Sequence, residues 1–425
     1  MGTWTSRRLA ALVALALSLA ACGGNDQGNG GQTGQKLNRT IKVGFVDVQS
    51  GPAAYLGQYE LNSIKVEVDR INKAGGLLGA QLEVVSRDDE LKADKAVTQV
   101  RELTSGDQPV DYLIGPGITG PYQAAKSVID DAGIPNCLSL VSGGGAFNHS
   151  SAPYSFRTLE PDALRIEPTI GYLGASGTKK VGMVYENDAT GQGLDAAIKP
   201  LAGKYGIDYV GVEYSSASDP TNVNQVRALL DKGIDTLLIS NVLPGSANSV
   251  NAVARLGATG KLKVFGWSGL RGVSFVDAAY PNTKGVVLMA GYSGAQTDIP
   301  QSQWPAAYRK HVQAVTQQFG IDTAPKSGAS SYKGAAEAAQ CIVNFEQAVK
   351  KAKSIDHKKV LSAMESLDIP ADQAPMGIHI TYSSSSHETY AGKQFYVYQW
   401  ETGADGKYLM KQVATPSDVQ KDVKS

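Results

Sequence analysis

One stretch of this 425-residue chain has the spacing of a nucleotide-binding loop. Gly115, Gly117 and Gly120 fit the pattern G-x-G-x-x-G, and they follow a strand-like run and open a helix-like one. A dinucleotide site also needs an acidic residue about 20 positions further on to hold the ribose hydroxyls. Residues 135–138 contain none. Prolines inside and beside the pattern lack the backbone N–H groups that a pyrophosphate would use. We therefore expect no nucleotide and no cofactor.

Residue types that serve catalysis and metal binding occur without the matching spacing. None of the five histidines belongs to an H-E-x-x-H or similar metal pattern. Residues 266–269, Gly-Trp-Ser-Gly, do not complete the G-x-S-x-G elbow of hydrolases. Residues 88–90 form an acidic cluster. The alternatives for this cluster are a role in catalysis or cation binding and a place in a solvated loop, and we favour the loop. The sequence predicts a protein that is not an enzyme and has no metal site.

The N-terminus has the three parts of an export signal. Arg7 and Arg8 make a basic start, residues 9–19 are apolar, and small residues precede Cys22. The apolar run is shorter than the roughly 20 residues that span a bilayer. Leu-Ala-Ala-Cys at 19–22 resembles the bacterial lipoprotein signal, which implies cleavage before Cys22 and lipidation of its thiol. The alternative is an ordinary secreted protein in which Cys22 is incidental.

The segment after Cys22 is rich in Gly, Asn and Gln and predicts a flexible tether. We expect residues 1–21 to be the signal peptide and 22–39 the tether. The mature protein would then be anchored to the extracellular face of the bacterial cell membrane through lipid on Cys22.

Length and composition limit the possible architecture and partners of the rest of the chain. About 385 residues remain after the tether, which suits two domains better than one core. The formal net charge is +0, so there is no electrostatic case for a nucleic-acid partner. Cys137 and Cys341 are the two other cysteines. Thiols of an exported protein can pair, but a chain of this size does not need the bond, and the sequence leaves their pairing open.

Strand-like and helix-like segments alternate from residue 40 onward. Alternate apolar residues in 41–45 predict a strand, and apolar residues spaced three and four apart in 61–71 predict an amphipathic helix. Further strands are expected at 81–87, 110–114, 181–185, 209–214 and 236–240. The alternation predicts an α/β fold with parallel sheets covered by helices on both faces.

The alternation breaks at three places, near residues 159, 291 and 377, where strand-like segments have no helix beside them. These are the places where the chain could pass between two α/β lobes. Because ligands bind beyond the carboxyl ends of parallel strands, two facing lobes would enclose a ligand in one cleft. The expected lobes are 40–159 plus 292–376 and 160–291 plus 377–425.

A series of short motifs occurs in a fixed order along the chain. The motifs are Gly51-Pro52, Ile71-Asn72, Gly75-Gly76, Asp88-Asp89, Ile114-Gly115-Pro116, Gly133-Ile134-Pro135, Phe156-Arg157-Thr158 and Gly191-Gln192-Gly193. Their joint order, from Ile41 to about Met410, resembles the type I periplasmic binding proteins of the leucine/isoleucine/valine-binding kind. The resemblance implies two Rossmann-like lobes joined by a three-segment hinge, and the role of substrate-binding subunit of an ABC importer.

The resemblance also implies a site for a ligand carboxylate on the first lobe. It places one hydroxyl on Thr119, at a helix start that favours an anion, and another on Ser142. Backbone groups near Leu140 and Gly143 would complete this half. A helix cap or a turn residue is the alternative for either hydroxyl taken singly.

The half of the site that would bind an amine departs from the family. Ser268 stands where a glutamate should pair with the ligand ammonium, and Thr190 and Val242 replace two aromatic residues. Asp188 is the other candidate for the countercharge. A ligand ammonium group that is buried without a countercharge typically loses about 2–5 kcal/mol of binding free energy. We therefore expect a carboxylate without a free α-amine to bind at least as well as leucine.

Tyr55 and Trp267 are candidates for an apolar wall of the site, with core packing as the alternative. Together these features predict a lipid-anchored, monomeric solute-binding protein. It would capture an amino acid or a related small carboxylate and present it to an ABC permease. The alternative is a surface ligand sensor of the same fold that takes no part in transport.

Overall fold

The computed structural model describes residues 36–51, 53–187, 189–216, 219–239, 241, 243–390 and 393–423. The expected signal peptide, the lipidation site Cys22 and nearly all of the tether lie outside these residues, as do the site candidates Asp188 and Val242. Within the described part of the chain, no helix combines the length and the apolar character needed to cross a bilayer.

The first lobe is built on a parallel sheet of five strands in the order β2-β1-β3-β4-β5. The strands are β1 (Ile41–Asp47), β2 (Leu82–Asp88), β3 (Tyr112–Ile114), β4 (Asn136–Leu138) and β5 (Ser155–Arg157). The predicted strand face of Ile41, Val43 and Phe45 is fully buried. Each strand ends at the same edge, so the loops that follow the strands lie together.

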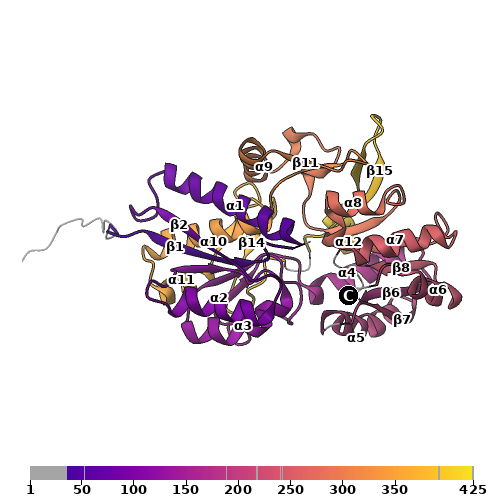
Figure 1. Cartoon of the computed structure of the whole chain (residues 1–425), viewed down its shortest axis with the longest axis horizontal. Coiled ribbons are helices and arrows are strands. Elements are labelled where there is room, and N and C mark those ends of the chain that lie inside the picture. The colour runs from indigo at the N-terminus through magenta and orange to yellow at the C-terminus, as the bar shows by residue number, and fades with distance from the viewer. Residues whose placement is uncertain are drawn as a thin grey trace, which may run out of the picture. The chain divides into compact units, whose positions relative to one another are not determined.

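Helices cover both faces of this sheet (Figure 1). α1 (Ala54–Lys73) and α10 (Ala336–Ala352) pack on the side of Val43 and Phe45. α2 (Ala93–Ser105) and α3 (Thr119–Ala132) pack on the opposite side, where Val46 points. α9 (Ala306–Phe319) lies against α1, and α11 (His357–Met364) against α10.

The second lobe has a mixed sheet of seven strands in the order β16-β15-β10-β9-β8-β6-β7. Five strands are parallel: β6 (Lys180–Glu186), β7 (Asp208–Ser215), β8 (Thr236–Ile239), β9 (Lys263–Gly266) and β10 (Val287–Ala290). The antiparallel pair β15 (Tyr396–Thr402) and β16 (Tyr408–Ala414) extends the sheet beyond β10. Its main helices are α4 (Asp162–Ala175), α5 (Ala189–Lys204), α6 (Val223–Asp231), α7 (Gly245–Arg255) and α8 (Val273–Ala279).

The remaining elements are short. They are the hairpin of β11 (Ile321–Thr323) and β12 (Ser330–Tyr332), the pair β13 (Asp368–Ile369) and β14 (Ile380–Thr381), the terminal helix α12 (Pro416–Lys421), and the 3₁₀ turns η1 (Ser268–Arg271), η2 (Gly294–Gln296) and η3 (Gln301–Gln303). The observed fold is the predicted one, two α/β lobes with largely parallel sheets.

Three crossovers join the lobes, and they meet at one point. Glu160, on the first crossover, accepts a hydrogen bond from the backbone N–H of Gly291, on the second, at 2.6 Å. A Cβ atom on Gly291 would lie 2.1 Å from the hydroxyl of Tyr390, at the start of the third. Only glycine fits between these side chains, so the hinge is packed tightly at this point.

The third crossover lies further along the chain than the sequence predicts. Residues 377–390, expected in the second lobe, belong with the first: β14 pairs with β13, and Glu388 bridges to Arg157 of β5. The physical reason is that Arg157 is fully buried and takes Glu388 as its countercharge. The chain enters the second sheet only at Tyr396.

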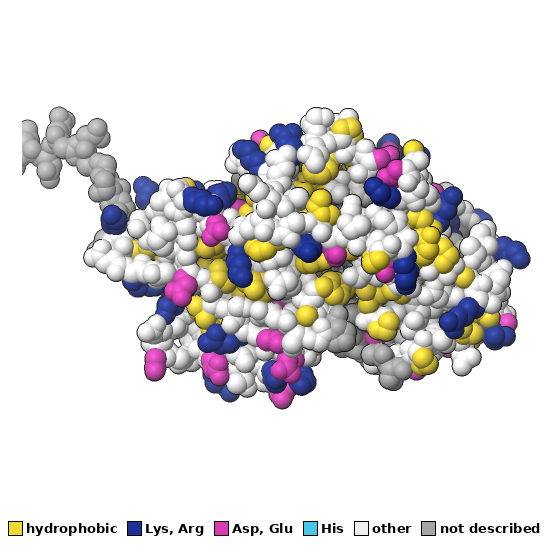
Figure 2. All heavy atoms as spheres, turned by 45° about the horizontal axis from the view of Figure 1, so that its top comes forward, with side chains coloured by type: hydrophobic (Ala, Val, Ile, Leu, Met, Phe, Trp, Pro, Cys, Tyr) yellow, Lys and Arg dark blue, Asp and Glu magenta, His cyan; other side chains and the backbone are white. Residues whose placement is uncertain are grey.

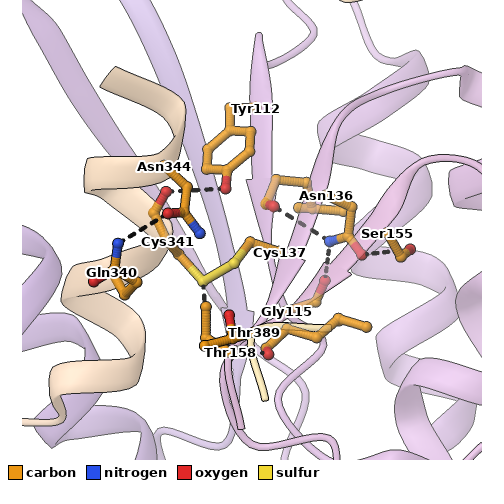
Figure 3. Close-up of a disulfide and its surroundings, with 12 residues drawn as sticks. Tyr112, Gly115, Asn136, Cys137, Ser155, Thr158, Gln340, Cys341, Asn344 and Thr389 are labelled. Carbon is orange, nitrogen blue, oxygen red and sulfur yellow. Dashed lines mark hydrogen bonds between the residues drawn. A yellow bond between two sulfur atoms is a disulfide. The ribbon is translucent and has the colours of Figure 1, made fainter. Parts of the chain in front are cut away.

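Cys137 and Cys341 are joined by a disulfide, which resolves the pairing that the sequence leaves open (Figure 3). The bond connects β4, in the sheet, to α10, across 204 residues of sequence, with a Cα–Cα distance of 5.7 Å. The hydroxyl of Tyr112 donates to the backbone carbonyl of Cys341 at 3.0 Å. A native disulfide typically stabilises a fold by about 2–4 kcal/mol.

Charged side chains of both signs are interspersed on the face that Figure 2 shows, and neither sign forms a large patch there. This distribution agrees with the zero net charge of the sequence. A basic stripe, the electrostatic footprint of nucleic-acid binding, is therefore not a feature of this face.

Candidate functional site

A cavity of about 330 Å³ lies between the two lobes, beyond the carboxyl ends of the first-lobe strands. Its first-lobe lining is Gln123 of α3 and residues 142–145, the loop after β4. Its second-lobe lining comes from α4 and α5, including Asp162 and Thr190. Larger cavities lie at the opposite ends of the second-lobe strands and on the outer side of α1, α9 and α10. Only the position of the interlobe cavity matches where open α/β sheets bind ligands.

Gly143 and Thr190 line this cavity, and Thr119, which is not among the described lining residues, contacts Gly143. The backbone N–H of Gly143 donates to the hydroxyl of Thr119 at 3.2 Å. A Cβ atom on Gly143 would lie 2.9 Å from Thr119 Cγ2 and 3.2 Å from Thr190 Oγ1. Residues from both lobes therefore meet at one glycine. Their ligand-binding role remains a prediction.

The hydroxyl of Thr119 does not cap its helix. α3 begins at Thr119, and its N-cap, Ile118, makes no side-chain hydrogen bond to the first turn. Backbone N–H groups in the first turn of a helix lack partners within the helix and carry partial positive charge. The predicted carboxylate site would use the backbone N–H groups of Thr119 and Gly120 at the start of α3, because Pro121 has none.

Ser142 also lies on the cavity lining, as predicted. Its hydroxyl donates to Asp162 Oδ2 at 3.4 Å, and its backbone carbonyl accepts from the backbone N–H of Asp162 at 2.9 Å. Asp162 is itself paired with Arg165 on the next turn of α4. The carboxylate of the cavity is thus already neutralised by a cation of its own helix.

The loop that carries Ser142 and Gly143 is held by Arg157, which the sequence analysis names only within a family motif. The guanidinium donates to the carbonyls of Ser142 at 3.0 Å, Gly143 at 2.7 Å and Gly145 at 2.8 Å. It is fully buried and pairs with Glu388. An arginine inside a short strand that otherwise reads as buried is the signal that could have identified this residue.

Three other predicted residues are not among the described residues that line the cavity. Trp267 is 1% exposed, donates from Nε1 to Thr169 Oγ1 at 2.9 Å, and is a core residue, which is the alternative considered for it. Ser268 is half-buried at the start of η1. Tyr55 is half-buried against Tyr59.

Leu140 is half-buried, and the described lining of the cavity begins two residues after it, at Ser142. Of the two positions whose backbone groups were predicted to bind the carboxylate, Gly143 therefore lies on the cavity lining, together with Gly144 and Gly145.

The first two glycines of the G-x-G-x-x-G pattern have a packing role. A Cβ atom on Gly115 would lie 2.0 Å from the backbone oxygen of Val46, and one on Gly117 would lie 2.3 Å from Asp47 Oδ1. Gly115 also has a φ of 88°, which favours glycine. The pattern lets the loop after β3 pass close to the end of β1.

Two buried carboxyl groups lie next to this contact. Asp47 ends β1 and Glu60 is on α1, with exposed fractions of 0% and 1%. Burial raises the pKa of Asp47 to about 7, although its hydrogen bond with Glu60 acts in the opposite direction. Burial also raises the pKa of Glu60 well above its ordinary value, and the neighbouring Asp47 adds to that rise. The pair therefore retains a proton near neutral pH.

An ion pair also spans the lobes beside the hinge. Arg271, in η1 of the second lobe, donates to Glu337 Oε1, in the first turn of α10, at 2.8 Å. Since Glu337 is largely buried, this contact is shielded from solvent and adds a specific polar link between the lobes.

Comparisons with known sequences agree with this architecture. A family model described as periplasmic binding protein matches residues 40–407. The leucine-, isoleucine-, valine-, threonine- and alanine-binding protein of Pseudomonas aeruginosa is 27% identical over 42% of this chain and 48% of its own length, so the match spans about half of that relative. The Leu/Ile/Val-binding protein of Escherichia coli K12 is 24% identical over 59% of this chain and 68% of its own.

Solved structures give the same fold. A periplasmic binding protein type 1 from Bordetella pertussis has a TM-score of 0.77 at 20% identity, covering 88% of this chain and 100% of its own. The LivJ substrate-binding protein from Streptococcus pneumoniae, in complex with isoleucine, has a TM-score of 0.72 at 21% identity, covering 88% and 99%. A solute-binding protein from Rhodopseudomonas palustris, in complex with 4-hydroxybenzoate, has a TM-score of 0.74 at 19% identity, covering 88% and 96%. This chain therefore belongs to the periplasmic binding protein family, and it has the fold of a type 1 member.

Proposed function

We propose that this protein is the substrate-binding component of an ABC importer, held at the extracellular face of the cell membrane by lipid on Cys22. It captures an amino acid or a related small carboxylate between its lobes and presents it to the permease. The observation that carries the proposal is an interlobe cavity lined by Ser142 and Gly143 of the first lobe and Thr190 of the second, with Thr119 in contact with Gly143.

A cavity lined from both lobes gives a ligand the means to favour one arrangement of them. A ligand that contacts both linings binds the closed form better than an open one, where half of its contacts are lost. Moving such an equilibrium from 1:99 to 99:1 requires about 5.5 kcal/mol of differential binding. A few hydrogen bonds to a charged ligand, each contributing about 1.5–3 kcal/mol, supply this amount.

The lining favours a carboxylate over an ammonium group. The start of α3 and the N–H groups of the glycine loop supply donors, whereas the described lining has a single carboxylate, Asp162, which Arg165 neutralises. Similar folds hold isoleucine in one solved structure and 4-hydroxybenzoate in another, so the scaffold suits acids with and without an α-amine. We propose that this protein prefers acids without one.

Calorimetry with leucine and with 4-methylpentanoate, which is leucine without its amine, tests the ligand class. We expect 4-methylpentanoate to bind at least as tightly as leucine. Micromolar binding of leucine with no binding of 4-methylpentanoate would overturn this preference. A thermal-shift screen of amino acids, aliphatic and aromatic carboxylates, amides and urea would then identify the ligand, since a thousandfold excess over Kd stabilises the fold by about 4 kcal/mol.

The anchor has its own test. Mass spectrometry of the mature N-terminus is expected to find a lipid-modified Cys22, and Cys22→Ala is expected to give a soluble or unprocessed protein. One acyl chain binds membranes only marginally, so stable anchoring needs more than one. An unmodified Cys22 in the mature protein would contradict the anchor and leave the binding role untouched.

A further inference from the structure

Three segments of the first lobe bring two imidazoles and a carboxylate together, away from the cavity. His149 lies in the loop after β4, Glu365 directly follows α11, and His387 lies beyond β14. His149 Nδ1 is 2.6 Å from Glu365 Oε1, and His387 Nε2 is 3.1 Å from the same oxygen. All three ligand atoms lie within 4.8 Å of one another.

The surroundings of His387 determine which ring nitrogen carries hydrogen. Its Nδ1 is 3.1 Å from the carbonyl oxygens of both Ala152 and Ser155, and a carbonyl oxygen only accepts hydrogen bonds. Nδ1 is therefore the protonated nitrogen. In the neutral ring, the lone pair of Nε2 then faces the carboxylate of Glu365, which is also an acceptor. Two acceptors in contact repel each other unless a cation or a further proton lies between them.

The same contacts are those of a metal-binding histidine. Such a residue donates its other ring N–H to a carbonyl or carboxylate, which fixes the tautomer and the ring orientation. The ring of His387 is also stacked on Phe156, with 4.1 Å between centroids, and is fully buried. His387 is thus held in a ligating orientation by its environment.

We propose that His149, Glu365 and His387 form a binding site for a divalent transition-metal ion, with Zn²⁺ as the best match. Two imidazoles and one carboxylate are a recognised zinc donor set, and a water molecule completes the tetrahedron. Mg²⁺ and Ca²⁺ prefer oxygen ligands throughout and are disfavoured by two nitrogens. The side chain of His149 is 59% exposed, which leaves an entry path and room for the water.

The spacing of the ligand atoms suits this ion with small side-chain movements. Tetrahedral Zn²⁺ with bonds of 2.0–2.1 Å separates its donor atoms by about 3.3 Å. The contacts of 2.6 Å and 3.1 Å and the upper limit of 4.8 Å lie on either side of that separation. No sequence motif reveals the site, because His149 and Glu365 are 216 residues apart.

Binding at this site would have a structural effect on the ligand loop. The backbone N–H of His149 donates to the carbonyl of Ser384, and that of His387 donates to the carbonyl of Phe147, at 2.9 Å and 2.8 Å. An ion ligated by both histidines would crosslink these two segments. The first of them continues directly from the loop that carries Ser142 and Gly143.

The test is calorimetric titration of the metal-free, untagged full chain with ZnCl₂, with Cys22→Ser in every variant so that no free thiol competes. We expect one Zn²⁺ per chain, and no displacement by millimolar Mg²⁺ or Ca²⁺. His149→Ala and Glu365→Gln are each expected to weaken binding at least tenfold. His379→Ala is the matched control, because His379 is an exposed histidine paired with a single carboxylate, Asp368, and it should leave binding unchanged.

Because the His149 side chain is largely exposed, His149→Ala should retain the fold, which the melting curve of the metal-free protein checks. X-ray absorption of the zinc-loaded chain is expected to show two imidazole ligands. The proposal is overturned if the parent binds no zinc, if both variants bind it as tightly as the parent, or if absorption shows no imidazole. None of these outcomes bears on ligand capture at the interlobe cavity.

Discussion

Arg157 and Glu388 are 231 residues apart in sequence, and they form a buried ion pair that supports the ligand loop. Arg157 Nε donates to Glu388 Oε2 at 2.8 Å, and the terminal nitrogens of the same guanidinium donate to three carbonyls of residues 142–145. Glu388 Oε1 also accepts from the backbone N–H of Phe147 at 2.9 Å. The conformation of the loop at the cavity thus depends on a charge that lies outside it.

Glu388→Gln is expected to destabilise the protein by about 3–5 kcal/mol, because it leaves the guanidinium of Arg157 buried without a countercharge. Urea unfolding measures the change. Asp405→Asn, which breaks an exposed pair with Lys407, is the matched control and should change stability by less than about 1 kcal/mol. Equal midpoints for the two variants would show that the buried pair does not have this structural role.

Thr119→Ala is expected to weaken binding of a carboxylate ligand by about 1.5–3 kcal/mol, the scale of one hydrogen bond to a charge. The loss corresponds to roughly 10- to 150-fold in Kd at 1.4 kcal/mol per tenfold. Calorimetry with the carboxylate identified by the screen measures it. Thr119→Ser keeps the hydroxyl and should bind within a few-fold of the parent. An unchanged Kd in Thr119→Ala would remove Thr119 from the site.

The buried carboxyl pair predicts a pH dependence of stability with a definite sign. Asp47 has a pKa raised to about 7 in the folded protein, above its ordinary value of 3.8, so the folded state binds the proton more tightly than the unfolded state. Its contribution to stability is therefore fully present below about pH 4 and is lost as the pH rises through 7.

Asp47→Asn removes this titration. Relative to the parent, the variant is expected to gain stability steadily between pH 5 and pH 8 in denaturant unfolding. Taking the difference between the two proteins removes the opposite contribution of carboxyl groups with lowered pKa values, such as Glu67 and Glu346. Stability curves that run parallel across this range would mean that Asp47 is ionised already at pH 5.

Local patterns were sufficient to predict the framework of the fold. Alternating strands and helices, and the places where that order breaks, follow from side-chain spacing within about ten residues. The observed sheets and the first two crossovers agree with them, whereas the third crossover does not. The sequence analysis did not identify β4 or β9 as strands. It assigned residues 377–390 to the wrong lobe, because their place is decided by the contact of Glu388 with Arg157.

The candidate site divides in the same way. Thr119, Ser142, Gly143 and Thr190 were identified through family motifs; the last three line one cavity, and Thr119 contacts Gly143. The sequence could not show whether Trp267 lines the ligand site or packs in the protein core, because an apolar side chain suits both places. Arg157 and the cluster of His149, Glu365 and His387 depend on contacts between segments that are far apart in the sequence, 231 residues for Arg157 and Glu388, and no local pattern records such contacts.

Gly143→Ala tests whether the lobes close at the point where Thr119 and Thr190 meet. The added methyl group would lie 2.9 Å from Thr119 Cγ2 and 3.2 Å from Thr190 Oγ1, closer than carbon atoms ordinarily approach. We expect the variant to fold, because φ at this position is not among the positive values that require glycine. The overlap with Thr119, on the same lobe, can be relieved by a small shift of that side chain, and the overlap with Thr190 by keeping the lobes apart. Small-angle scattering of the parent should show compaction on ligand saturation, whereas Gly143→Ala should show less compaction and weaker binding. Gly120→Ala, on the first turn of the same helix as Thr119, meets nothing within 4 Å and is the control. Full compaction of Gly143→Ala with the parent's affinity would show that closure does not pass through this contact.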